Sequence, residues 1–197
     1  MKRIIVSIST IIALALPALA SAALWNIDPD HSNVGFKVRH LMVSNVKGSF
    51  DKHAGTVDIN DKDITKSKVE VTIDTTSVNS GTAAFDKHLQ SADFFDAAKF
   101  PMASFKSTSV KPAGLNKFTV VGNLTIKDIS KPVTLAVTMN GAGKHPMAGK
   151  QAIGFTATAS IKRSDFGVGA YAPTVSDEVH LRITTEGMLA DAATTAK

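Results

Sequence analysis

Hydrophobic residues recur at every second position from Val34 almost to the end of this chain. Successive side chains of a β-strand point to opposite faces, so this period of two predicts strands with one apolar and one polar face. Antiparallel sheets with one face in water show this alternation, whereas parallel sheets of α/β enzymes have near-continuous apolar strands. The alternation is clearest over residues 34–38, 69–73, 118–126, 133–139, 153–161 and 179–183. It predicts an antiparallel sheet and argues against a parallel α/β enzyme.

The strands are expected to be short and to follow one another directly along the chain. We place them at about 24–27, 33–41, 46–59, 68–74, 102–109, 117–126, 133–139, 151–162 and 179–188. Turn-forming residues separate several of them, at 60–63, 111–114 and 140–143. Many strands with turns at this spacing are typical of a sandwich or a barrel. We therefore expect an all-β fold, an antiparallel barrel of about eight strands.

One segment, from Ser80 to Lys99, changes to a helical period. Phe85 and Leu89 lie one turn apart there, and Ser80 or Thr82 is a candidate N-cap, because a hydroxyl can accept from a free backbone N–H. Residues 91–98 predict a second helical turn, which ends before Phe100-Pro101. We expect a short helical crossover that either closes one mouth of the barrel or packs on the core.

The first 22 residues have the pattern of a secretory signal peptide. Lys2 and Arg3 precede a short apolar stretch over 4–16, and small residues at 18–22 offer a cleavage site. The apolar stretch is shorter than the ~20 residues of a spanning helix. We expect cleavage near Ala23, export to the periplasm, and one mature domain over 23–197, with an uncleaved anchor as the alternative.

Composition excludes several classes of site. The chain has no cysteine, so a thiol nucleophile, a thiolate metal site, a redox dithiol and a lipoprotein anchor are all excluded. Without Lys2 and Arg3 the mature chain has 20 basic and 17 acidic residues, a net charge of +3. No run rich in Lys and Arg accompanies this excess, so nucleic acid is not expected as a partner.

The apolar phase of several strands contains small residues where a filled barrel would need large ones. Gly122, Ala103, Ala157 and Ala159 share the phase of neighbouring Phe or Leu residues. An interior of about eight strands is just wide enough to be filled by side chains or to hold one slim ligand. Close packing would require the missing volume from elsewhere, either from a bound lipid chain or from the phenylalanines 36, 50, 105 and 155.

No arrangement of residues predicts an enzyme. The six histidines show no H-x-x-x-H spacing, and His40 and His180 are interpreted as lying on the polar phase. His31 lies beside Asp28 and Ser32, but no G-x-S-x-G elbow, P-loop or dinucleotide fingerprint occurs. No catalytic residue, metal site or cofactor is predicted.

The order of the motifs along the chain resembles the YceI-like family of exported, lipocalin-like proteins. The resemblance runs from about Trp25 to Glu186. It rests on Asp28-x-x-His31-Ser32-x-Val34-x-Phe36-x-Val38-x-His40, Gly48-x-Phe50, His88-Leu89-x-Ser91-Ala92-Asp93-Phe94-Phe95-Asp96, Lys99-Phe100-Pro101, Gly122-x-Leu124-Thr125-Ile126, Lys131-Pro132-Val133, Arg163-Ser164-Asp165-Phe166-Gly167 and Ser176-Asp177-Glu178-Val179.

The resemblance implies a lipocalin-like barrel whose apolar pocket holds a polyisoprenoid tail, as of a prenyl quinone or prenyl phosphate, or a fatty-acid-like amphiphile. Candidate pocket residues are those of the apolar phase and of the crossover: Phe36, Val38, Phe50, Val71, Ile73, Phe85, Leu89, Phe94, Phe105, Val120, Leu124, Leu135, Val137, Phe155, Ala157, Ala159 and Leu181. For the head group, Arg163 would suit a phosphate, and His88 or Tyr171 would suit a quinone carbonyl.

Three hypotheses follow. The first is a non-enzymatic periplasmic protein that binds, stores or transports such a lipid, with transient contact with a membrane or membrane protein. The second is an enzyme acting on the lipid, with His31 or His88 as acid–base. The third is a solid barrel that serves as a stress-response interaction module. Whether the protein forms a homodimer is left undecided by the sequence: the resemblance implies a dimer, but no exposed apolar stripe argues for one.

Overall fold

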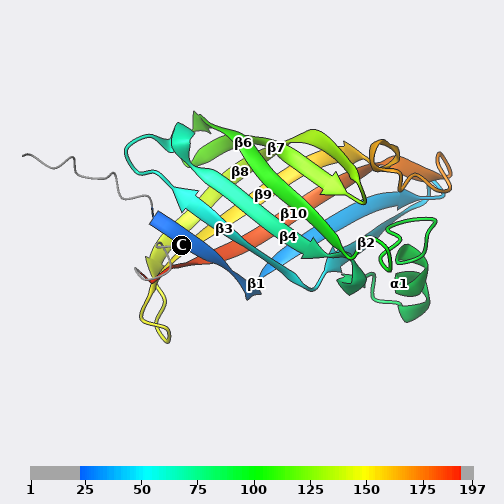
Figure 1. The fold of residues 1–197 in the computed structure, drawn as a ribbon, viewed down its shortest axis with the longest axis horizontal. Helices are drawn as coiled ribbons and strands as arrows, with labels where there is room; N and C mark the ends of the chain where they lie inside the picture. The colour runs from blue at the N-terminus through cyan, green and yellow to red at the C-terminus, as the bar shows by residue number, and fades with distance from the viewer. Residues whose placement is uncertain (1–22, 192–197) are drawn as a thin grey trace, which may run out of the picture.

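The computed structural model describes residues 23–191 as an elongated antiparallel β-barrel with one short helix at its end (Figure 1). The predicted signal peptide lies outside the described residues. The elements are β1 (Ala23–His40), β2 (Ser44–Phe50), β3 (His53–Ile59), η1 (Ile64–Lys66), β4 (Lys68–Asp74), η2 (Thr75–Ser77), β5 (Val78–Asn79), α1 (Ala83–Leu89), β6 (Met102–Gly114), β7 (Lys117–Ile126), β8 (Ile129–Lys144), β9 (Gln151–Lys162), η3 (Arg163–Phe166) and β10 (Val175–Leu189).

The sheet closes because its first and last strands pair. Strand order is β10-β9-β8-β7-β6-β4-β3-β1-β2-β5, and β1 also pairs with β10 along most of its length. β2 and β3 form one bent strand interrupted at Asp51 and Lys52, and β4 and β5 form another around η2. Counted in this way, the ten strands make a closed barrel of eight, as the alternation predicted.

The barrel has two ends, which we name by the segments that surround them (Figure 1). The crossover mouth carries α1, the β1–β2 turn over 41–43 and the loop over 163–174. The far mouth carries the loop over 60–67, the β6–β7 turn at 115–116 and the β8–β9 loop over 145–150. Both the expected helix and the loop with Arg163 therefore lie at the same mouth.

Several predicted boundaries were wrong. Residues 91–98 form turns and no second helical segment, and α1 has Thr82 at its N-cap without a side-chain hydrogen bond. The Ser80 hydroxyl and the Ser80 backbone N–H instead both donate to the Asp86 carboxylate, each at a distance of 2.6 Å. The predicted turns at 111–114 and 140–143 belong to strands, because the β6–β7 and β8–β9 hairpins continue past them with shifts of register.

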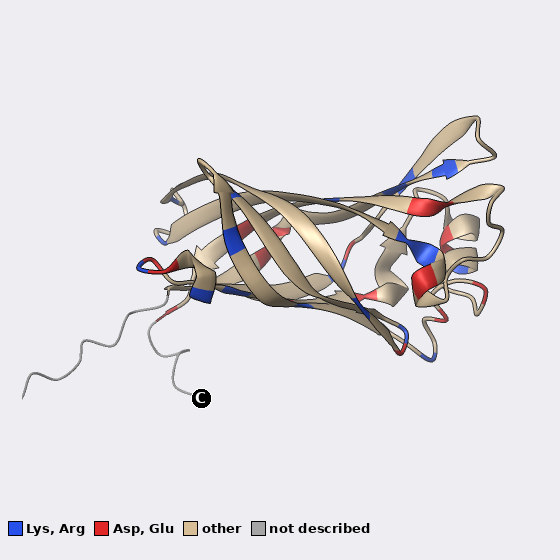
Figure 2. Cartoon of the chain, turned by 90° about the horizontal axis from the view of Figure 1, so that it is seen from above, with Lys and Arg blue, Asp and Glu red and all other residues tan. Residues whose placement is uncertain are grey.

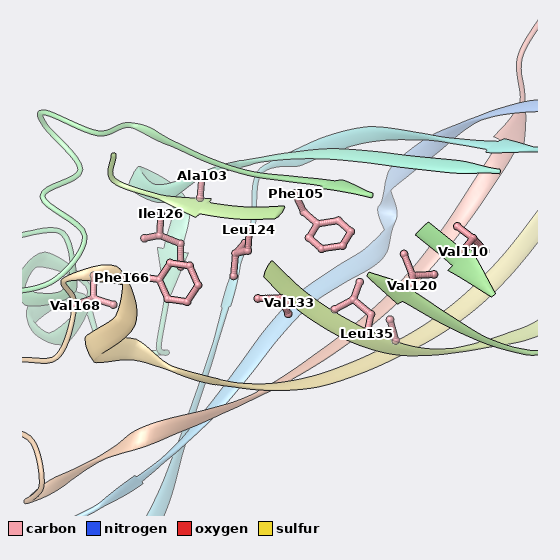
Figure 3. Packing of buried hydrophobic residues seen from close by; sticks show 11 residues of the cluster. Ala103, Phe105, Val110, Val120, Leu124, Ile126, Val133, Leu135, Phe166 and Val168 are labelled. Carbon is pink, nitrogen blue, oxygen red and sulfur yellow. The ribbon is translucent and has the colours of Figure 1, made fainter. Parts of the chain in front are cut away.

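The buried core occupies only part of the interior. Its apolar cluster comes from β6, β7, β8 and β9 together with Phe166 and Val168 of the η3 loop (Figure 3). Phe166 is 2% exposed and lies beside Ile126 near the crossover mouth in the close-up. The core therefore holds one wall of the barrel and the η3 loop together.

Candidate functional site

The barrel encloses a cavity of about 890 Å³. Its lining begins at the far mouth with Ala23, Ile59 and Ala142, and reaches the crossover mouth at Leu41 and Tyr171. Ligand pockets usually measure about 300–1,000 Å³, so the space suits a whole small molecule. The hypothesis of a solid barrel is therefore wrong: side chains line this interior without filling it.

All but one of the predicted pocket residues line the cavity. They are Phe36, Val38, Phe50, Val71, Ile73, Phe85, Leu89, Phe94, Phe105, Val120, Leu124, Leu135, Val137, Phe155, Ala157 and Leu181. Ala159 is the exception, since it packs against the buried cluster and does not line the cavity. Its strand phase matches that of Ala157, although it is only half-buried.

Two aromatic rings lie over glycines of a neighbouring strand, which leave room for them. A Cβ built on Gly48 would come within 2.4 Å of the tip of the Phe36 ring, and one on Gly122 within 2.4 Å of the tip of the Phe105 ring. The alternative that phenylalanines supply the missing volume is thus correct at Gly122, and Gly48 is a second such position that the sequence did not single out. The rings cover the wall there, and the centre of the barrel stays open.

The sequence reasoning missed most of the other lining residues, although their strand phase could have identified them. They include Trp25, Ile27, Val34, Val57, Val69, Val110, Phe118, Ile126, Val133, Met139, Ile153, Ile161, Val179 and Ile183. A few polar side chains interrupt this surface, among them Ser32, His53 and Thr185. The Ser32 hydroxyl is within 2.9 Å of the Thr185 hydroxyl, so those two satisfy each other. The lining is otherwise almost entirely apolar.

The interpretation of His40 was wrong. It continues the phase of Phe36 and Val38 and lines the cavity near the crossover mouth. His180 does face outward, with its Nδ1 atom 2.8 Å from the Ser160 hydroxyl. Counting two residues on from Val38 would have placed His40 correctly.

The crossover mouth is bordered by an aromatic cluster of His88, Phe94 and Tyr171. The His88 ring packs edge-on against Phe94, with 5.1 Å between centroids, and Tyr171 stacks on Phe94 at 6.0 Å. His88 and Tyr171 also meet edge-on at 5.8 Å, and all three line the cavity. These contacts join the crossover to the loop after η3, so this cluster forms part of the border of the mouth.

Arg163 lines the cavity too, but its guanidinium is largely used by its own loop. Nε donates to the carbonyl of Ser176 at 2.8 Å, and Nη2 to that of Val175 at 2.7 Å. Nη1 donates to the carbonyls of Val168 and Ala170 at 2.9 and 2.6 Å. Four of the five N–H donors of an arginine are thus engaged, and the residue orders the loop.

Burial lowers the pKa of the Arg163 guanidinium, and the nearby Asp177 carboxylate acts in the opposite direction. Asp177 itself accepts from the Ser164 hydroxyl at 2.7 Å, and that hydrogen bond is the main reason its own pKa is lowered. Within residues 23–191 no carboxylate forms an ion pair with Arg163. The buried positive charge beside the mouth is therefore stabilised mainly by carbonyl groups, with the Asp177 carboxylate nearby but not in direct contact.

His31 and Asp28 form an ion pair, with 2.8 Å between Nδ1 and Oδ2, but no catalytic arrangement. The Ser32 hydroxyl points to Thr185, so the three residues do not form a Ser-His-Asp relay. In the described part of the chain no group of three His, Asp or Glu side chains could hold a metal ion. No helix over 23–191 is long and apolar enough to span a membrane.

Comparison with known proteins agrees with this geometry. A family model described as a YceI-like domain matches residues 25–187. The chain belongs to the YceI-like family. A YceI protein of Salmonella newport is 40% identical over 190 residues, which cover 95% of this chain and 98% of that protein.

Solved structures of YceI-like and related barrels share the fold. The crystal structure of Burkholderia cenocepacia BcnA matches with a TM-score of 0.74 and 30% identity, covering 81% of this chain and 98% of that one. A polyisoprenoid-binding domain from Saccharophagus degradans matches with a TM-score of 0.63 over 86% of this chain and all of that one. At 15% identity, the second likeness shows the fold alone.

Proposed function

We propose that this YceI-like protein binds a polyisoprenoid lipid, such as a prenyl quinone or a prenyl phosphate, or a related long-chain amphiphile, inside the barrel. The observation that carries the proposal is the cavity of about 890 Å³ with its apolar lining. A long, slim, greasy molecule suits this shape, and the name of the Saccharophagus degradans domain, which shares the fold, is consistent with it.

The dimensions favour a chain over a compact ligand. β10 has 15 residues and spans about 50 Å along its own direction, at ~3.3 Å per residue. Lining residues occur along this whole length, from Met139 on β8 and Ile153 on β9 to Val175 near the crossover mouth. A flexible hydrocarbon chain can follow such a tunnel, whereas a compact ligand would leave much of it empty.

The energetics favour slow exchange. Burying ~20 methylene equivalents at ~0.8 kcal/mol each yields ~16 kcal/mol before costs. Association and ordering of the chain offset several kcal/mol of this gain. The remaining affinity is high, so release benefits from an acceptor membrane or protein.

The polar head is proposed to lie at the crossover mouth, near His88, Arg163 and Tyr171. His88 and Tyr171 are partly exposed and line the cavity, so their polar atoms are within reach of a head group. Arg163 contributes mainly a positive potential, since the loop carbonyls already take four of its N–H groups. This arrangement favours an anionic or carbonyl-bearing head.

The proposed role is non-enzymatic. Ser32, the only hydroxyl beside His31 in sequence, is paired with Thr185. His88 packs against the rings of Phe94 and Tyr171 and lies 3.6 Å from the Asp93 carboxylate, with no side-chain hydrogen bond to a hydroxyl within residues 23–191. We also propose that residues 1–22 direct export and that the protein acts in the periplasm, carrying the lipid between membranes or storing it. An exported carrier needs no disulfide here, because a closed sheet with a buried cluster holds the barrel together.

Native mass spectrometry of the protein purified without detergent tests the proposal. We expect a hydrophobic molecule to co-purify, and organic extraction should identify a long prenyl or acyl chain. Repeated recovery of empty protein that also fails to take up added prenyl lipids would contradict the proposal. Fractionation of cells, with the periplasmic fraction assayed separately, tests the localisation.

A further inference from the structure

The turn between β1 and β2 exposes three large apolar side chains to solvent. Leu41, Met42 and Val43 are 51%, 60% and 83% exposed. Three consecutive exposed apolar residues at a hairpin tip are unfavourable in water unless they meet another surface. We call these three residues the apolar tip.

The backbone of the apolar tip makes this choice of residues more unusual. Leu41 and Met42 both have positive φ, 49° and 60°, and Val43 N–H donates to the carbonyl of His40 at 3.1 Å. A tight hairpin turn of this kind normally contains Asn, Asp or Gly, because other residues are disfavoured at positive φ. Neither the conformation nor burial accounts for Leu and Met here.

The apolar tip lies at the crossover mouth and continues the surface of the cavity. Leu41 lines the cavity while also facing solvent. Tyr171, which is 56% exposed, lines the cavity from the neighbouring loop. That loop lies close to the tip, because His40, next to the tip, pairs with Val175, four residues after Tyr171. An apolar path therefore leads from the interior to the tip.

The stem of the same hairpin is basic. Lys37, Arg39 and Lys47 alternate with the inward-facing residues and thus point outward, and Lys37 lies directly opposite Lys47. Like charges in directly opposed positions are destabilising. None of the three forms an ion pair within residues 23–191. An external anionic partner would offset this repulsion.

Neighbouring strands extend the basic surface, although β10 also carries two acidic residues near the mouth, Asp177 and Glu178. On β10, His180 lies opposite Lys37 and Arg182 opposite Gly35. Glu178 also faces outward there, in register with Lys162 of β9. Figure 2 shows that charged residues gather mainly at the ends of the barrel, with Lys and Arg scattered on the strands. The outer face of the β1–β2 hairpin is therefore positive overall.

We propose that the β1–β2 hairpin docks the crossover mouth on a bilayer that contains anionic phospholipids. The apolar tip enters the interface between head groups and acyl chains, Tyr171 lies at head-group level, and the basic stem contacts the phosphates. The inference deepens the proposed function, because a docked mouth lets a lipid chain pass between cavity and membrane without crossing water.

A second copy of the chain fits this surface less well. A stable protein interface buries about 800 Å² on each partner, far more than three side chains of one turn provide. Two copies meeting through this hairpin would also bring their basic stems together. Charge complementarity therefore favours an anionic bilayer.

Vesicle flotation tests the proposal with a variant that preserves the turn. Met42→Asn combined with Val43→Ser removes two apolar side chains, and Asn is well tolerated at positive φ. The matched control is Leu115→Asn with Met147→Ser, which removes two apolar residues that are even more exposed, 90% and 89%, from the far mouth. Lys47→Gln tests the stem. Thermal unfolding of each variant verifies the fold.

The wild-type protein should float with vesicles of phosphatidylglycerol and phosphatidylcholine, and less with phosphatidylcholine alone or at high salt. The tip variant should lose about tenfold or more of this binding while remaining at least as stable, whereas the control should bind as wild type does. Lys47→Gln should weaken binding only to the anionic vesicles.

Three results would overturn docking. The tip variant could float as well as the wild type does, or the wild type could fail to float. A change of sedimentation coefficient confined to the tip variant would instead assign the tip to contact between copies of the chain. Extraction of bound lipid from the same preparations keeps the proposals separate. Lipid-loaded protein that fails to float contradicts docking alone. Empty protein that floats, but that takes up no added prenyl lipid, contradicts only the proposed function.

Discussion

Filling the cavity at one alanine should separate ligand binding from stability. Ala157 lines the cavity and lies in register with Val137 on β8 and Ile183 on β10. Phenylalanine at this position would direct a ring into the space that the lipid chain is proposed to occupy. Because the ring enters the cavity, Ala157→Phe should change the free energy of unfolding of the empty protein by no more than ~1 kcal/mol.

The effect on binding should be far larger. A ring that displaces about five methylene groups of the ligand removes ~4 kcal/mol at ~0.8 kcal/mol each, a loss of affinity of up to about a thousandfold. Titration with a fluorescent prenyl-chain analogue measures the affinity, and urea denaturation measures the stability.

The neighbouring strand supplies the control. Ala136 of β8 is exposed and lies next to Val137, so Ala136→Phe places the same ring on the outer face. It should leave the affinity unchanged. Unchanged affinity in Ala157→Phe, or an equal loss in both variants, would refute the assignment of this interior to the ligand. Ala159→Phe should instead perturb packing, because Ala159 does not line the cavity.

Three further predictions follow from local geometry. Gly48→Ala should lower the free energy of unfolding by ~1–3 kcal/mol in urea denaturation, because the new Cβ would overlap the Phe36 ring. Adding Phe36→Leu should restore most of the lost stability, and a double variant without any recovery would contradict the overlap. Arg163→Met should lower the free energy of unfolding by ~2–5 kcal/mol, since it leaves four carbonyls without their donor. It should also speed backbone hydrogen exchange over 163–176, and unchanged exchange would contradict the role of Arg163 in ordering this loop. The hydrogen bond with Asp28 raises the pKa of His31, and the same bond lowers the pKa of Asp28. The pair therefore stabilises the fold between these two pKa values, and its contribution is lost as pH rises through the raised His31 value or falls through the lowered Asp28 value. NMR titration of Asp28→Asn should show a lower His31 pKa, and an unchanged value would contradict the pairing.

The period of two predicted which residues face inward, but not what covers them. It placed Phe36, Leu124 and Ala157 on the cavity lining correctly, because strand geometry alone decides the face. Ala159 has the same phase, yet it packs against the buried cluster and is not part of the lining, which strand geometry alone does not reveal. The same counting would have placed His40 inside.

The hydrophobic period did not predict the conformations of the loops and turns. Arg163 bonds to carbonyls 5 to 13 residues further along the chain, in a conformation that no local spacing predicts. Pro112 and Gly141 suggested turns, yet both are paired within hairpins that shift register around them. Turn-forming residues predict where a chain can bend, whereas the partner strand decides whether it does.

A crystal structure of the protein purified under native conditions tests the central claim most directly. The account predicts continuous, unbranched density along the barrel axis, beginning near His88 and Tyr171 and running past Ala157. An interior that contains only ordered water, or that has collapsed so that its own side chains meet across the axis, would contradict it.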